Sequence, residues 1–413
     1  MRRRPLTRML LALLVIPLLS GCWNKMEIEE GAYALAIGID RGEELPYSVT
    51  VQIAKPGAIA GQEGGGGEEK PAVLSTVEAP SLSSALSMLN GFTGRMVNLH
   101  HVRAVFVHEE LAREDGLNFL DELVRFRQSR QTMFFIVTRE KASEFLEEID
   151  AKLAKNPMRY IEELAYNYRR NAMMPAEGQL NAIISRLDVA YAEPLSYYAA
   201  LVDEEEKRES ESVSAQAEAG FKAGELPRKG GSNVEMIGAA AFRQQRMVGV
   251  LTGDEVRHLL ILQDQFRQAF VSVHDPKMPE RYISVQLSRS RPFQFHADLS
   301  GPRPRLYGLV SLEAEILGVQ SGIDYSEPEL QALLETSIAR QVREPIDRLI
   351  EKTQRWEADV VGFGRHLVSQ FPTVDAWEQY RWPEKYPDAE FNITIDVRLR
   401  RFGLTLSPVE PVD

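Results

Sequence analysis

Cysteine is almost missing from this sequence, whose 413 residues include only Cys22. One thiol can form neither an intrachain disulfide nor a site with several thiolate ligands. Histidine is scarce too, with seven residues and no His-Glu-x-x-His motif. The one adjacent pair, His100 and His101, would point to opposite faces of a strand. We therefore predict no metal site and no cofactor.

Motifs of covalent catalysis are missing as well. No Gly-x-Ser-x-Gly sequence marks a nucleophilic serine. The glycines at 64–67 are not followed by Gly-Lys-Ser/Thr, so they do not form a phosphate-binding loop. Acidic side chains are abundant, but abundance alone does not identify an acid–base pair. We expect no enzymatic activity.

Basic residues are fewer than acidic ones: the chain has 48 Lys and Arg against 60 Asp and Glu, and its formal net charge is −12. Residues 1–21 carry four arginines and no acidic residue, so a chain starting at Cys22 has a net charge of −16. Phosphate backbones and anionic lipid headgroups repel such a chain. No polybasic patch offsets this charge, and we expect no nucleic-acid partner.

Long apolar runs are absent after residue 22, and the one marked run covers residues 11–22. It is shorter than the roughly 20 residues that a membrane-spanning helix needs. Arginines precede it and the small residues Ser20 and Gly21 end it, as in a cleaved signal peptide. Leu19-Ser20-Gly21-Cys22 resembles the bacterial lipobox, in which the thiol receives diacylglycerol and the cysteine becomes the new N-terminus.

This motif predicts a lipid-anchored protein in which Cys22 is an N-palmitoyl, S-diacylglycerol cysteine. Two or three acyl chains give a stable tether, because each buried methylene contributes about 0.8 kcal/mol. Almost no flexible spacer separates Cys22 from sequence that is typical of a folded domain. Trp23 comes directly after the cysteine, and tryptophan is favoured at the depth of the lipid headgroups. We expect a body held close to the extracytoplasmic face of a membrane. The alternative is an ordinary secretory signal followed by a chance cysteine.

Strand and helix patterns alternate through the first half of the chain, which predicts an α/β or α+β domain ending near residue 202. The expected strands are 33–40, 47–53, 101–108, 133–138 and 197–202, and the expected helices are 81–90, 116–125, 141–153, 158–170 and 179–190. An acidic run, 203–211, then begins a polar linker or long loop. Such a run could bind calcium, but it lacks the spacing of an oxygen cage.

The second half begins with a hairpin over 235–251 and a capping box, Thr252 with Glu255. A second capping box, Ser326 with Glu329, is expected to start the longest helix, over 327–352, which Pro345 should bend or split. Another helix is expected over 359–370. Alternating strands are expected over 283–287, 310–316 and 391–399.

These patterns predict an α+β, multidomain fold of mixed β-sheets packed by α-helices, behind a cleaved lipoprotein signal peptide. The expected parts are a signal peptide (1–21), an N-terminal α/β domain (22–202), a linker or long loop (203–232), a middle hairpin–helix–strand region (233–300) and a C-terminal α+β domain (301–413). Large aromatic residues gather near the C-terminus: Trp356, Trp377, Tyr380, Trp382 and Tyr386. We interpret them as core packing, with a sugar or peptide platform as the alternative.

Seven stretches of this chain resemble the Ger(x)C family, the C subunits of spore germinant receptors, and they occur in the family's order. They are 21–28 with 36–40, 98–107, 238–242, 248–252, 358–364 and 395–403. The chain departs from the family pattern at Asn24, at Lys25-Met26 and at Phe402. These departures bear on which receptor the protein serves.

The resemblance implies a non-enzymatic lipoprotein on the outer face of the inner spore membrane, anchored through acylated Cys22. It also implies assembly with two membrane subunits, A and B, to detect nutrients and trigger germination, and clustering with other germination proteins. No catalytic or germinant-binding residue is implied. The alternative is a solute-binding lipoprotein of a membrane transporter, which would need two similar lobes around a cleft and a long tether.

Overall fold

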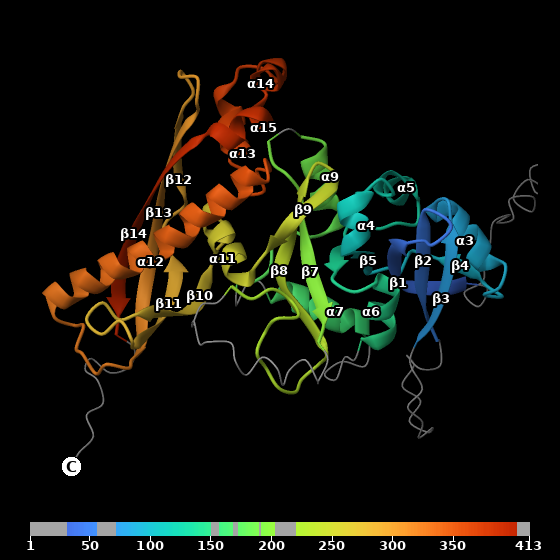
Figure 1. Ribbon diagram of the computed structural model, residues 1–413, viewed down its shortest axis with the longest axis horizontal. Helices are drawn as coiled ribbons and strands as arrows, with labels where there is room; N and C mark the ends of the chain where they lie inside the picture. Colours follow the sequence, from blue (N-terminus) through green and yellow to red (C-terminus); the bar gives the residue numbers. More distant parts are fainter. Residues whose placement is uncertain are drawn as a thin grey trace, which may run out of the picture.

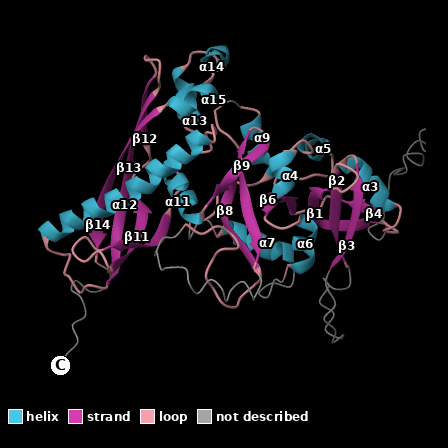
Figure 2. Cartoon of the chain, in the orientation of Figure 1, coloured by secondary structure: helices cyan, strands magenta, loops and turns pink. Residues whose placement is uncertain are grey.

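The structure is a computed structural model that describes residues 31–55, 72–149, 157–167, 172–189, 191–202 and 220–402. Two β-sheets follow one another along the long axis of the molecule, and helices pack on both (Figure 1). Figure 2 shows that strands and helices are mixed in both halves. The predicted α+β class with mixed sheets and packed helices is confirmed. The predicted signal peptide, Cys22, the glycine run and the acidic run 203–211 lie outside the described residues.

The first sheet has nine strands within the described ranges, in the order β3-β2-β1-β5-β6-β7-β8-β9, with β4 paired to β1. Their bounds are β1 Gly31–Arg41, β2 Tyr47–Ala54, β3 Ala72–Ala79, β4 Met96–Asn98, β5 Ala104–His108, β6 Phe134–Thr138, β7 Leu195–Leu201, β8 Val234–Arg243 and β9 Arg246–Leu251. The hairpin β8–β9 continues this sheet, because β8 pairs antiparallel with β7.

The centre of this sheet is parallel, since β1, β5, β6 and β7 all run in one direction. Strands β5 and β6 read Ala-Val-Phe-Val-His and Phe-Phe-Ile-Val-Thr and are buried almost throughout, as parallel strands covered on both faces should be. One face packs against α3 (Leu82–Asn90), α4 (Glu109–Glu114), α5 (Leu120–Arg125) and α9 (Leu180–Leu187). The other packs against α6 (Ala142–Glu148) and α7 (Pro157–Tyr166).

The second sheet has five strands within the described part of the chain, in the order β10-β11-β13-β12, with β14 pairing parallel to β13. They are β10 Gln268–His274, β11 Tyr282–Arg289, β12 Gln294–Asp298, β13 Arg305–Val319 and β14 Glu390–Arg401. Its helices are α12 (Pro328–Arg355), α13 (Gly364–Leu367), α14 (Val374–Tyr380) and α15 (Trp382–Lys385), with 3-10 turns η3 (Val368–Gln370) and η4 (Tyr386–Asp388). The apolar stripe of α12 packs against the sheet.

Helix α11 (Gly253–Leu262) connects the two sheets and is buried along most of its length. One apolar core runs from the ends of β7, β8 and β9 through α11 to the second sheet and α12. The halves therefore share buried surface. Among the described helices, none is both long enough and apolar enough to cross a bilayer.

Local signals predicted some helix ends correctly and others wrongly. The capping box of Thr252 and Glu255 is confirmed at the start of α11. The box at Ser326 is wrong: the N-cap is Glu327, with no side-chain cap bond, because Pro328 occupies the first helical position. Of the two effects predicted for Pro345, the split is wrong, since α12 continues through it and packing of its apolar stripe outweighs the lost backbone bond. The bend stays a prediction.

Candidate functional site

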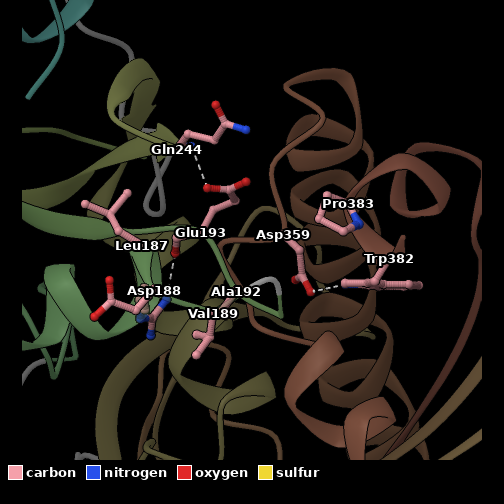
Figure 3. Close-up of a pocket in the computed structure, with 10 residues that line it drawn as sticks. Leu187, Asp188, Val189, Ala192, Glu193, Gln244, Asp359, Trp382 and Pro383 are labelled. Carbon is pink, nitrogen blue, oxygen red and sulfur yellow. Dashed lines mark hydrogen bonds between the residues drawn. The ribbon is translucent and has the colours of Figure 1, made fainter. Parts of the chain in front are cut away.

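The loop between α12 and α13 lies where the two halves meet and is organised by Asp359 (Figure 3). The Asp359 side chain is buried, and its carboxylate accepts four hydrogen bonds. Oδ1 accepts from the backbone N–H groups of Gly362 (2.8 Å) and Phe363 (3.1 Å). Oδ2 accepts from the N–H of Gly364 (2.9 Å) and the indole N–H of Trp382 (2.8 Å). Burial raises the pKa of Asp359, and the four hydrogen bonds oppose that rise.

Two glycines allow the loop to fold this tightly. Gly362 has a φ of +85°, which L side chains rarely adopt. A Cβ on Gly364 would lie 2.6 Å from the carbonyl oxygen of Tyr191 and 2.6 Å from Cδ1 of Trp382. The segment before β7 therefore approaches the loop at a distance that leaves no room for a side chain at this position.

Arg186, in α9, reaches the same loop from the first half of the molecule. It is 6% exposed, and its Nη1 donates to the carbonyl oxygens of Glu193 (3.0 Å) and Val360 (3.2 Å). Its Nη2 lies 3.7 Å from a carboxylate oxygen of Glu177. Burial lowers the pKa of Arg186, and the carboxylates of Glu177 and Asp359 act against that change.

Helix α11 also holds the loop. Nε2 of Gln263, the C-cap residue of α11, donates to the carbonyl oxygens of Val360 and Val361, each at 3.2 Å. Buried carbonyl groups need such partners, because an unpaired one costs about 1–3 kcal/mol. The loop is therefore held by side chains from α9, from α11 and from α15.

Glu193 completes the contact between the halves. Its backbone N–H donates to the carbonyl oxygen of Asp359 at 2.9 Å, and its carboxylate accepts from the N–H of Gln244 in the β8–β9 turn at 2.6 Å. Burial raises the pKa of Glu193, and the Gln244 hydrogen bond opposes this. We call Arg186, Glu193, Asp359 and Trp382 the junction cluster.

A cavity of about 250 Å³ lies beside the junction cluster (Figure 3). It is lined by Arg186, Leu187, Asp188, Val189, Ala192, Glu193, Gln244, Asp359, Trp382 and Pro383. The charged groups of the cluster are already engaged in the hydrogen bonds given above. The arrangement therefore holds the two halves together through these hydrogen bonds.

The structure describes some of the residues that the sequence singled out, but not Cys22, which lies outside the described ranges. His100 and His101 are exposed, and the ring of His101 packs edge-on against Tyr33 at 5.0 Å. Within the described ranges, no group of three or more His, Cys, Asp or Glu side chains is placed to hold a metal ion. The interpretation of the C-terminal aromatics as packing is confirmed for Trp377, Trp382 and Tyr386, which are buried.

The junction cluster was missed by the sequence analysis. The stretch 358–364 was noted for its resemblance, but the helix predicted over 359–370 starts only at Gly364, as α13 and then the 3-10 turn η3. The prediction is therefore wrong for residues 359–363. The side chain of Asp359 bonds three successive N–H groups and so competes with helix formation. Another stretch of the resemblance, 36–40, acts similarly, because Asp40 accepts from the N–H groups of Ala142 (2.6 Å) and Ser143 (3.0 Å) at the start of α6.

Two family models match this chain, and the second begins inside β8, a strand of the first sheet. Residues 24–196 match the family described as "Spore germination protein N-terminal domain", and residues 237–403 match "Spore germination B3/ GerAC like, C-terminal". The chain belongs to the Ger(x)C family of spore germination proteins.

Individual relatives match along almost the whole length. Spore germination protein KC of Bacillus subtilis (strain 168) is 24% identical over 413 residues, covering 97% of this chain and 96% of the relative. Putative spore germination protein YfkR of the same organism is 25% identical over 405 residues, covering 97% and 98%. The crystal structure of the GerBC protein superposes with a TM-score of 0.52 at 15% identity, covering 88% of this chain and 96% of that one, and so shares the fold.

Proposed function

We propose that this protein is the lipid-anchored C subunit of a spore nutrient germinant receptor, on the outer face of the inner spore membrane. In this proposal it assembles with membrane subunits A and B to trigger germination. The observation that carries the proposal is the match of both halves to spore germination families, in order and over nearly the full length of the relatives.

The geometry supports a subunit that works by contact. The charged groups of the junction cluster hold α9, α11 and α15 to one loop, so the two sheets present their outer surfaces in a constant arrangement. A subunit that transmits a signal between membrane partners needs such a rigid body, because a loose connection would dissipate any displacement. The proposal includes no catalytic step.

The transporter alternative requires two similar lobes. Instead, the first sheet has a parallel centre flanked by antiparallel strands, while the second is antiparallel except for β14. This difference favours the receptor subunit over a solute-binding lipoprotein.

The test is replacement of Cys22 by alanine in the native spore former, with Ser87→Ala, an exposed serine in α3, as the matched control. We expect Cys22→Ala to leave the membrane fraction and to impair nutrient germination, while the control does neither. Mass spectrometry of the N-terminal peptide should show a diacylglyceryl, N-acylated cysteine, and mild detergent should co-extract the A and B subunits. An unmodified thiol in the native protein, or a Cys22→Ala protein that stays on the membrane, would overturn the anchoring model.

A further inference from the structure

An exposed apolar tip is formed where α3 turns into β4. Three large side chains there face solvent: Met88 is 47% exposed, Phe92 60% and Met96 58%. Isolated exposed apolar residues are ordinary on protein surfaces, but three at one turn are a feature that needs a partner. We call Met88, Phe92 and Met96 the apolar tip.

The fold does not need these side chains for its core. The buried face of α3 is made of other residues, Leu82, Ala85, Leu86 and Leu89. The turn itself is fixed by hydrogen bonds, from the N–H of Phe92 to the carbonyl oxygen of Leu89 (3.2 Å) and from the N–H of Val97 to Oδ1 of Asn90 (2.8 Å). A well-anchored turn therefore holds apolar groups away from the protein.

The position of the tip relates it to the N-terminus. β1 and β4 run parallel, and Gly31 pairs with Met96 at the first position of both strands. The chain therefore enters β1 beside the tip. Only eight residues, 23–30, separate Gly31 from Cys22, and this length of chain spans at most about 30 Å even when fully extended.

The segment that forms the tip also has an unusual composition for this protein. Residues 79–108 contain no aspartate or glutamate, although the chain has 60 acidic residues in all. Arg95, next to Met96, is exposed. A lipid surface could cover this turn without desolvating a carboxylate of the turn, and an arginine beside apolar side chains can reach the phosphate level.

We infer that the apolar tip inserts into the headgroup region of the bilayer beside the lipid anchor and so fixes the orientation of the body on the membrane. This inference rests on the proposed anchoring at Cys22. The tether keeps the tip near the surface at high effective concentration, so a contact too weak to hold a free protein is sufficient. The proposed partner of the apolar tip is the lipid bilayer. The tether holds the protein at the membrane, so its net negative charge need not be offset by electrostatic attraction to the headgroups.

The test uses the full-length acylated protein in vesicles of phosphatidylethanolamine and phosphatidylglycerol. Because acylation consumes the one native thiol, Phe92→Cys introduces a single site for an environment-sensitive fluorophore. Val374→Cys, in α14 of the other half, is the matched control at a position that is 69% exposed (Figure 1). Side chains at a membrane interface lie about 5–10 Å into the boundary, so nitroxide lipids should lower the emission of the label at position 92 about two-fold and leave that at position 374 unchanged.

Two fluorescence results would overturn the inference. A label at position 92 that is as exposed to water as the label at position 374 would overturn the inference. A label that is shielded from water but not quenched by nitroxide lipid would also overturn it, because protein and not lipid would then cover the tip. Failure of the anchor is a separate result: the protein would not float with the vesicles, whereas failure of the tip alone leaves it vesicle-bound with an exposed label.

Discussion

The indole N–H of Trp382 donates a 2.8 Å hydrogen bond to the carboxylate of Asp359, twenty-three residues earlier in the chain, and both side chains are buried. The same carboxylate organises the loop that contacts Arg186 and Glu193 of the first half. This one acidic side chain therefore links the local shape of a loop to the arrangement of the whole molecule.

Replacing Asp359 with asparagine should destabilise the protein strongly. The amide nitrogen can accept no hydrogen bond, so one pair of donors loses its acceptor whichever way the amide is turned. The pair is either the N–H groups of Gly362 and Phe363, or the N–H of Gly364 with the indole N–H of Trp382. We expect a loss of about 3–5 kcal/mol in the free energy of unfolding, measured by urea denaturation. Trp382→Phe, which removes one donor and keeps most of the ring, should cost about 1–3 kcal/mol. An Asp359→Asn protein as stable as the wild type would show that the loop does not depend on this carboxylate.

Replacing Arg186 with methionine should loosen the contact between the halves. Methionine keeps apolar bulk but leaves the carbonyl groups of Glu193 and Val360 without this donor, at a cost of about 1–3 kcal/mol. Hydrogen exchange should become faster at the amides of residues 362–364. Arg303→Met, at an exposed arginine, should change stability by less than about 0.5 kcal/mol. Unchanged exchange in Arg186→Met would contradict a role for this side chain in the junction.

A single methyl group at Gly364 should be poorly tolerated. The added Cβ would lie 2.6 Å from the backbone oxygen of Tyr191, and backbone cannot move aside as a flexible side chain can. We expect Gly364→Ala to cost about 1–3 kcal/mol, seen as a lower urea midpoint. Gly301→Ala is the control, since its Cβ would approach no neighbouring atom closer than 3.6 Å. Equal midpoints for the two variants would disprove the close approach.

The stability of the protein should depend on pH through His258 in α11. Burial lowers the pKa of His258 below its usual 6.5, with Arg257 and Arg348 acting in the same direction and Asp254 against it. The unfolded chain therefore binds a proton at a higher pH than the folded one. This part of the stability is complete above pH 6.5 and is lost as the pH falls from there through the lowered pKa.

His258→Gln should flatten that dependence. Urea midpoints between pH 8 and pH 5 should fall less steeply in the variant than in the wild type. Some slope should remain, because burial also lowers the pKa of His366. Identical slopes in the two proteins would rule out His258 as a contributor.

Much of the fold could be predicted from sequence because its signals are local. The runs that became β5 and β6 and the alternation in β14 each follow from the periodicity of their own residues. The capping box at Thr252 was visible for the same reason, since its two partners are three residues apart. The lipobox at Cys22 is another local pattern, and acylation there stays a prediction.

The junction cluster could not be predicted in this way. Arg186 and Val360 are 174 residues apart in the chain, and no spacing rule connects an arginine in one helix with a carbonyl in a distant loop. The stretch 358–364 has apolar residues that favour a helix, and the loop forms only because Trp382, Gln263 and Tyr191 surround it. The sequence by itself determined the elements, the charge and the candidate anchor, which depend on neighbours along the chain. The tertiary structure alone decided which buried polar groups meet, because burial makes each of them require a partner, and distant segments supply it.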